Sequence, residues 1–396
     1  MRPLLLLALL LFTSCAWMAP DPLEISAERA QNWLLWNQNP DGSWGSPESR
    51  RGHQEVLTGS PHTFVAHGQT CTALAILALL PECDDDPVLR QAIHKGLKLL
   101  LAERLSQRSS PNVFCDVWSH SYRLECFCRI LEHSGFRDQH LPIRAATKDA
   151  IAALIGLQGV DGGFAYYDSP KGANGKADFS YSGIANARPV HTGGQSTTFN
   201  TALALRSLIL ARSCGFDVPE KILVNTASCL RSSAMADGGF AYGTRFARTF
   251  SPATYVHKGA AGRSSLCWLA LDDCGQHTQK EIAYALQLFA ADYPFLIAAQ
   301  GRPIPHEGYY SNAGYYVLFG HCYAIEAAAR IGDQASLTGV ASQLMKLQNL
   351  DGSYIDYPLY NYGHAYGTAY ALIALRQAQD GHSSAPRISA PIDDRR

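Results

Sequence analysis

The chain has 396 residues, of which 47% are hydrophobic, and a net charge of −1 from 33 basic and 34 acidic side chains. This apolar content suffices for a large buried core, and the absence of a basic run excludes the charge pattern of a nucleic-acid-binding protein. The eleven cysteines contain no C-x-x-C pair and have no regular spacing, so they identify no disulfide framework.

The N-terminus is typical of an export signal. Arg2 precedes the apolar run Leu4–Phe12, which is too short to span a bilayer. Phe-Thr-Ser-Cys then resembles a bacterial lipobox. We therefore expect residues 1–15 to be a signal peptide with lipid attachment at Cys15. The protein would be exported to the periplasm or cell envelope and held at the membrane only by that lipid. Ordinary cleavage after Ala16 or Ala19 is the alternative.

A short turn signature recurs along the chain. It reads Gln-x-x-Asp-Gly-x-aromatic at Gln38–Trp44, Gln158–Phe164 and Gln348–Tyr354, with a degenerate copy at Met235–Phe240. Asp-Gly forms tight turns because aspartate bonds its own backbone and glycine tolerates positive φ. We expect the aromatic residue to pack each turn against the neighbouring repeat.

Segments of helical periodicity flank these turns and form six pairs. The first members are predicted at Ala27–Trp36, Pro87–Leu105, Ile143–Leu157, Pro219–Ala234, Thr278–Ala299 and Gln334–Leu347. The second members are predicted at Gln69–Leu80, Ser121–His133, Ser196–Ala211, Arg263–Asp273, Tyr315–Ile331 and Gly367–Ala378. The second helices are rich in Ala, Leu and Cys and poor in charge, which indicates burial. The first helices carry more charge and are expected outside them.

These pairs predict an all-α fold, an α/α toroid (α6/α6 barrel) of six helix hairpins. Outer-to-inner connections are long and inner-to-outer connections are short, so all long loops lie on one face, where we expect the functional mouth. One domain is expected over residues 22–379, because neither half of a ring buries its inner helices alone. Residues 380–396, rich in Ser, Pro and charge, are expected to form a disordered tail.

The turn signature and the stretch Gly367–Leu375 resemble the prenyltransferase/squalene-oxidase repeat superfamily, which includes terpenoid cyclases and protein prenyltransferases. The resemblance covers the mature chain and implies an α/α toroid with an isoprenoid ligand. The Asp-x-Asp-Asp motif with which squalene–hopene-type cyclases protonate an alkene is absent. Asp84–Asp86 and Asp272–Asp273 are instead expected to serve helix ends.

The zinc motif of the prenyltransferases is absent as well. Gly367 stands where their His-Thr-x-Tyr stretch supplies a ligand, with His364 one turn earlier as a substitute. Asp272 and Cys274 have the spacing of the other ligands but follow the wrong end of their helix. We therefore expect no metal and no cofactor.

The predicted mouth gathers histidine, tyrosine and acidic side chains. The candidate catalytic residues are His120, His321, His364, Asp116 and Asp168. The candidate ligand-binding residues are His191, Arg263, Tyr315, Tyr316, Tyr362 and Tyr366. Inner helices begin at this face, so their dipoles favour an anionic or electron-rich ligand. The structural alternative for each residue is a helix cap or a packed side chain.

Three functions fit these features. The first is an acid–base enzyme acting on an isoprenoid, or a lyase or hydrolase acting on an envelope polysaccharide, for which Asp116 and Asp168 are the nominated carboxylates. The second is a monomeric, non-catalytic binder of a small molecule, isoprenoid or glycan. The third is a protein-interaction scaffold. The sequence leaves enzyme and binder equally open.

Overall fold

The structure is a computed structural model that describes residues 21–48, 61–102, 116–166, 196–243, 259–302 and 314–381. These ranges fold into helices, with isolated β-bridges and no strand, which confirms the predicted all-α class. The predicted signal peptide with Cys15 and nearly all of the predicted tail lie outside the described residues.

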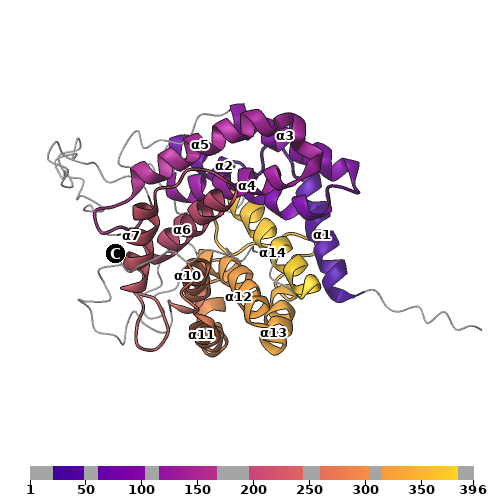
Figure 1. Ribbon diagram of the computed structural model, residues 1–396. Coiled ribbons are helices and arrows are strands. Elements are labelled where there is room, and N and C mark those ends of the chain that lie inside the picture. The colour runs from indigo at the N-terminus through magenta and orange to yellow at the C-terminus, as the bar shows by residue number, and fades with distance from the viewer. Residues whose placement is uncertain are drawn as a thin grey trace, which may run out of the picture.

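Twelve α-helices of the described residues form two concentric layers (Figure 1). The inner helices are α2 (Pro61–Leu79), α4 (Asp116–Glu132), α6 (Thr198–Ser213), α10 (Ala261–Asp273), α12 (Val317–Ile331) and α14 (Tyr362–Asp380). The outer helices are α1 (Pro22–Trp36), α3 (Pro87–Ala102), α5 (His140–Leu157), α7 (Glu220–Arg231), α11 (Gln279–Ile297) and α13 (Gln334–Met345). Short 3-10 helices occur at Leu80–Glu82, Ser134–Gln139 and Gly314–Tyr316.

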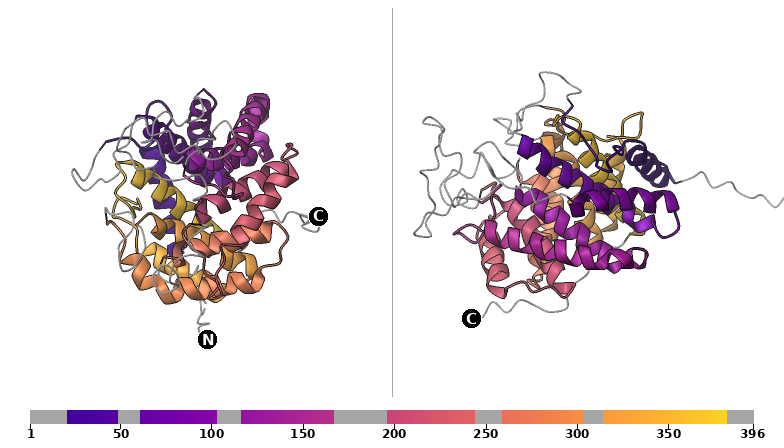
Figure 2. Two further views of the ribbon diagram at one scale, coloured as in Figure 1. Left: turned by 90° about the vertical axis from the view of Figure 1, so that its left-hand side faces the viewer. Right: turned by 90° about the horizontal axis from the view of Figure 1, so that it is seen from above.

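The inner helices form a closed ring. Each contacts the next one along the chain, and α14 returns to contact α2. Outer helices pack on the inner helix that precedes them, and α1 packs on α14, which joins the two ends of the chain (Figures 1 and 2). The pairs in space are therefore shifted by one helix from the predicted pairs, because the short inner-to-outer connections decide which helices are adjacent.

The apolar character of the inner helices explains their position. All residues of α6 from Thr198 to Ala211 are buried except Arg206, so this helix has no side suited to water. Phe64–Glu82 is apolar enough to cross a membrane, but 72% of its window is buried inside the protein, as expected for a core helix. Three inner helices begin at least five residues earlier than predicted, at Pro61, Asp116 and Tyr362, because their first turns are polar or aromatic rather than aliphatic.

The repeated turns clamp each repeat to the next. The Gln38 amide donates to the carbonyl oxygen of Ala92 on α3, and Gln158 does the same to Ile222 on α7. Gln348 donates to Ser26 on α1 and so closes the ring between the last repeat and the first. The same amides also donate to the glycine carbonyl oxygen of their own turns, which satisfies a half-buried group.

The glycine of the turn allows this close approach. Gly352 has φ +91°, and a Cβ there would lie 2.5 Å from the carbonyl oxygen of Arg29 on α1. Gly42 repeats the geometry against Lys95 on α3. Only glycine combines positive φ with so short a distance between backbones. The aromatic residues Trp44 and Tyr354 are fully buried beside these contacts, in the packing position expected from the sequence.

The ring has two different ends, called the loop end and the hairpin end. The loop end is where the inner helices begin and where the long connections 37–60, 103–115, 158–197, 232–260, 298–316 and 346–361 enter them. The hairpin end is where the inner helices end and the short connections 80–86, 133–139, 214–219, 274–278 and 332–333 lie.

Candidate functional site

Packed aromatic side chains fill the described part of the loop end. Phe199, at the start of α6, contacts the rings of Tyr166, Tyr242, Tyr315, Tyr316 and Phe319. The hydroxyl of Tyr166 hydrogen-bonds to those of Tyr242 and Tyr315, the latter at 3.1 Å. Burial raises the pKa of Tyr166 and of Tyr315 well above the usual value of 10, so both remain neutral hydrogen-bonding groups.

Arg263 is a buried cation at this end. Its side chain is 1% exposed, and its Nε donates to the carbonyl oxygen of Phe240 at 3.0 Å while Nη1 donates to Gly259. The guanidinium lies over the rings of Tyr242 and Tyr316, 5.9 and 5.7 Å from their centroids. No acidic side chain of the described residues pairs with it. Within the part of the chain that the structure describes, carbonyl dipoles and aromatic faces stabilise this positive charge.

The other predicted ligand-binding tyrosines lie where the sequence placed them, at the start of α14. Tyr362 packs against the buried ring of His67, 5.6 Å away. Burial lowers the pKa of His67 from 6.5 to about 4, so this imidazole is neutral at physiological pH. Tyr366 donates its hydroxyl hydrogen bond to the carboxylate of Asp356 at 2.6 Å.

Asp356 is a titratable group that the sequence did not reveal. It is fully buried, and its carboxylate also accepts from the backbone nitrogen of Leu318 in the first turn of α12. Burial raises its pKa from 3.8 to about 7, although both hydrogen bonds act in the opposite direction. Nothing in the Ile-Asp-Tyr-Pro stretch signals this environment, because it arises only when the connection 346–361 folds beneath α12.

Two candidate catalytic histidines face the outer layer instead of the lumen. The ring of His321 packs edge-on against Phe289 and Tyr293 of α11, at 5.3 and 5.5 Å, and its Nδ1 lies 2.7 Å from the carbonyl oxygen of Val317. Burial lowers its pKa to about 4. His364 stacks on Trp33 of α1, with the ring centroids 6.0 Å apart. Both rings pack against side chains of the outer helices, which disfavours proton transfer to a ligand at the centre of the ring.

Two of the remaining candidate catalytic residues lie one turn apart on α4. Trp118, between them in the sequence, contacts Tyr366 of α14, with ring centroids 5.7 Å apart. Asp116 and His120 are both buried and lie two positions before and after Trp118, about 200° around the helix on its opposite side. Asp168 and His191 lie outside the described residues, and their predicted roles stay predictions.

A cavity of about 290 Å³ opens at the hairpin end. It is bounded by α2, α4, α6, α12 and α14. Its polar or titratable lining residues are Tyr122, Glu125, Arg129, Glu132, His133, Arg206, Cys322, Tyr323, Glu326, Tyr370, Arg376, Gln377 and Asp380. Its volume is at the lower limit of small-molecule sites, at about 300–1,000 Å³. The mouth predicted from the sequence is the other end of the ring, the loop end.

Three tyrosine hydroxyls meet on the wall of this cavity. Tyr122 hydrogen-bonds to Tyr323 and accepts from Tyr370, both at 2.8 Å. Trp118 donates its indole N–H to Tyr370 at 3.3 Å. Burial, the largest cause, raises the pKa of Tyr122 well above 10. The three hydroxyls therefore form a neutral hydrogen-bonding group beside aromatic faces.

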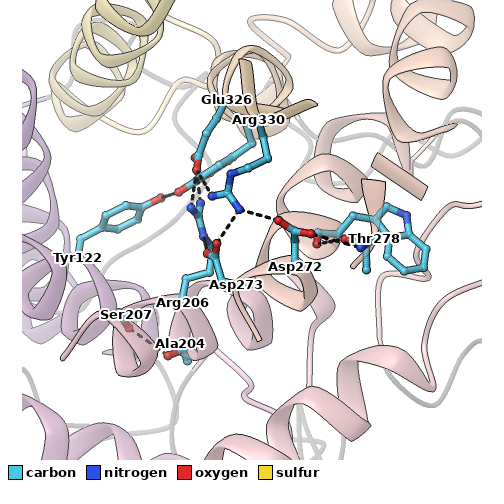
Figure 3. Close-up of polar contacts among 11 residues, drawn as sticks. Tyr122, Ala204, Arg206, Ser207, Asp272, Asp273, Thr278, Glu326 and Arg330 are labelled. Carbon is cyan, nitrogen blue, oxygen red and sulfur yellow. Dashed lines mark hydrogen bonds and ion pairs between the residues drawn. The ribbon is translucent and has the colours of Figure 1, made fainter. Parts of the chain in front are cut away.

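An ion-pair network stabilises the same end of the ring (Figure 3). Arg206 binds Glu326 through both terminal nitrogens and Asp273 through Nε at 2.7 Å. Arg330 contacts Asp272 and Asp273, each at 2.9 Å. The network joins α6, α10 and α12, and it gives the adjacent aspartates the helix-end role expected from the sequence. It also fixes two charged groups, Arg206 and Glu326, on the cavity wall.

Glu125 differs from the paired acids. None of the hydrogen bonds or ion pairs of the described residues involves its carboxyl group. The side chain is half-buried, and its exposed part faces the cavity, so protein surrounds it even where it is accessible. Burial raises the pKa of Glu125, opposed by the positive charges of Arg129 and Arg206. Such a carboxyl group keeps its proton to a higher pH than an exposed glutamic acid does, and it can deliver that proton to a bound ligand.

Donor atoms suited to a metal ion occur beside this cavity. Cys83, Asp84 and His133 each offer one such atom, and these atoms lie within 4.8 Å of one another. His133 is also part of the cavity wall.

The fold has solved counterparts with different activities. The type II terpene cyclase MstE from Scytonema, in complex with geranylgeranyl dihydroxybenzoate, matches 91% of this chain and 98% of its own with a TM-score of 0.54 and 14% identity. Lin0763 from Listeria innocua matches 91% and 98% with a TM-score of 0.54 and 13% identity. The GH76A α-1,6-mannanase from Salegentibacter sp. HEL1_6 matches 91% and 99% with a TM-score of 0.52 and 11% identity.

These likenesses confirm the predicted α/α toroid and its resemblance to the terpene cyclase-like superfamily at the level of the fold. No family model and no curated protein matches the chain by sequence. Because a cyclase and a mannanase share this architecture, the fold does not select the chemistry, which has to be argued from the site.

Proposed function

We propose that the protein binds a small, mainly apolar ligand in the cavity at the hairpin end and that Glu125 acts on it as an acid–base group. The observation that carries this proposal is the position of Glu125, whose carboxyl group has no hydrogen-bond partner among the described residues and shares a cavity with three tyrosine hydroxyls. A raised carboxyl pKa, aromatic faces and limited solvent access are the conditions under which a glutamic acid donates a proton.

Isoprenoids are the ligand class that these groups suit best. Protonation of an alkene creates a carbocation, and the faces of Tyr122, Tyr323 and Tyr370 supply the negative quadrupole that stabilises a cation. Proton transfer from Glu125 to an alkene carbon, followed by loss of a proton from the product cation, is an isomerisation that needs no cofactor. The prenylated ligand of MstE is consistent with this class.

Glycan chemistry is less well supported by the cavity. Hydrolysis of a glycoside needs a second carboxylate placed across the bond. Glu326 is a second carboxylate of the cavity wall, and both of its oxygens bind Arg206. Glu132 and Asp380 also line the cavity, but both are exposed. The polysaccharide alternative therefore finds less support in this cavity than an isoprenoid ligand does.

The loop end is the second candidate site, because Arg263 is a buried cation without an acidic partner of the described residues. An anionic head group could bind there between Tyr242 and Tyr316. Export with lipid attachment at Cys15 remains part of the proposal. It would place the protein beside the membrane, where isoprenoid lipids reside.

The proposal is tested with geranylgeraniol, its diphosphate and α-1,6-mannotriose as probes, in thermal-shift and mass-spectrometric assays. Wild type is expected to be stabilised by an isoprenoid and to convert it to an isomer of equal mass. Glu125→Gln keeps the shape of the side chain and should retain binding but lose conversion by at least about 100-fold, the scale of acid–base catalysis. Glu132→Gln, at the exposed rim of the same cavity, is the control.

Two results would count against it. Isoprenoid binding that is lost in Arg263→Gln but unchanged in Glu125→Gln and Tyr323→Phe would place the site at the loop end. Conversion at the wild-type rate in Glu125→Gln would remove its role as an acid.

A further inference from the structure

A cluster of three metal-ligand side chains lies at the hairpin end, outside the groups used above. Cys83 and Asp84 follow the 3-10 turn that ends α2, and His133 follows the last residue of α4. These helices are neighbours in the inner ring, so their ends bring the three side chains together. No sequence motif indicates this site, because 48 residues lie between Asp84 and His133 and no zinc-type spacing connects them.

The separations between donor atoms are close to those of a coordinated ion. Nδ1 of His133 lies 3.7 Å from Oδ2 of Asp84, and Sγ of Cys83 lies 4.0 Å from Oδ1 of the same carboxylate. Ligands of a tetrahedral zinc ion, with bonds of about 2.0–2.3 Å, are separated by about 3.4–3.6 Å. Small side-chain rotations therefore bring the carboxylate, the thiol sulfur and the imidazole to coordination distance.

The turn that carries two of the donors is held in place by Arg90. Its Nε donates to the carbonyl oxygen of Cys83 at 3.2 Å, and its Nη2 donates to that of Asp84. These bonds fix the backbone while leaving both donor side chains available. Cys83 is buried, His133 is half-buried and Asp84 is exposed, so an ion can enter from solvent on the side of Asp84.

We propose that Cys83, Asp84 and His133 bind one divalent transition-metal ion, with zinc as the best match to the donors. A thiolate, an imidazole and a carboxylate together suit zinc, and they exclude the hard ions that prefer oxygen ligands alone. Thiolate and carboxylate carry two negative charges, which balance the charge of the ion.

Three protein ligands leave the fourth position to water or to another ligand. Because His133 also belongs to the cavity wall, this position lies at the edge of the cavity of about 290 Å³. The site does not depend on Glu125 or on a bound isoprenoid, so the metal proposal and the proposed function can fail independently.

Cobalt(II) is the probe, because a thiolate bound to it gives a near-ultraviolet charge-transfer band and tetrahedral coordination gives strong visible bands. The protein is the full chain with Cys15→Ser, which removes the predicted lipidation site. With Cys83, Asp84 and His133 unchanged, this protein should give both bands at one cobalt per chain, and zinc should displace the cobalt. Cys83→Ser should abolish the charge-transfer band, and His133→Gln should weaken cobalt binding at least about 10-fold.

Two further variants control the experiment. Cys214→Ser changes a partly accessible cysteine outside the cluster and should leave the spectrum unchanged. Asp84→Asn alters an exposed side chain, so it tests the site without risk to folding, and it should also weaken binding at least about 10-fold. No charge-transfer band in wild type at saturating cobalt, or the same band in Cys83→Ser, would overturn the proposal.

Discussion

The buried imidazole of His321 makes the protein sensitive to acid in a way that one substitution can isolate. Its ring is fully buried between α11 and α12, and burial lowers its pKa from 6.5 to about 4. Between these two values the unfolded chain binds a proton that the folded protein excludes. The free energy of unfolding therefore falls as the pH decreases from 6.5 to 4. The full loss is about 3 kcal/mol, of which about 2 kcal/mol has occurred at pH 5.

His321→Phe removes this titration while keeping an aromatic ring against Phe289 and Tyr293. The carbonyl oxygen of Val317 remains bonded within the helix, so the change at pH 8 should be below about 1.5 kcal/mol. Between pH 8 and pH 5 the variant should gain about 2 kcal/mol of stability relative to wild type. Urea unfolding followed by circular dichroism at both pH values measures the difference.

His277→Asn is the control, because this histidine is exposed. It keeps His321 and is measured at the same two pH values. Other groups that titrate in this range, such as Asp356, are present in both proteins and cancel in the comparison. A gap between His321→Phe and wild type that does not change with pH would show that the imidazole is protonated or solvated in the folded protein, and the reasoning would be refuted.

Three further predictions concern stability and are measured by urea unfolding. Burial raises the pKa of Asp356 in the folded protein to about 7, so wild type loses stability as the pH rises from 4 to 7. Asp356→Asn should therefore gain about 4 kcal/mol relative to wild type between pH 4 and pH 8. Parallel curves of unfolding free energy against pH for the two proteins would contradict this. Glu326→Gln removes a buried partner of two arginines and should cost about 3–5 kcal/mol. Glu82 pairs with Arg376 but its carboxylate is 41% exposed, so Glu82→Gln should cost less than about 1 kcal/mol. Equal losses in Glu326→Gln and Glu82→Gln would refute the distinction between buried and exposed ion pairs. Gly352→Ala forces a Cβ against the backbone of Arg29 and should cost more than about 1 kcal/mol, whereas Gly339→Ala, which has open space in α13, should stabilise by about 0.5–1 kcal/mol.

The placement of candidate residues shows where sequence reasoning stops. The histidines near the helix starts were predicted to be catalytic because they lie near the loop end. Their position along the helix axis agrees with this prediction. Their direction around the helix was unknown, and His321 and His364 turn toward α11 and α1. A residue of an inner helix can face the centre of the ring or the outer helices. Because such a helix is apolar on all sides, its sequence has no periodic stripe that distinguishes these two faces.

The sequence by itself determined the architecture. The Gln-x-x-Asp-Gly turns, the six pairs of helical segments and the alternation of long and short connections are local signals, and together they predicted the α/α toroid. The clamp made by Gln38, Gln158 and Gln348 shows why: each turn specifies its own contact with the next repeat, so the ring follows from repetition of one local rule.

Only the tertiary structure decided where polar groups converge. Glu125, Arg206 and Glu326 come from three helices and share one cavity wall, and Cys83 and His133 meet because α2 and α4 end side by side. The carboxyl group of Asp356 acquires its environment from a connection and two helices that close over it. These properties depend on distances and burial between segments far apart in the chain, which no local pattern encodes.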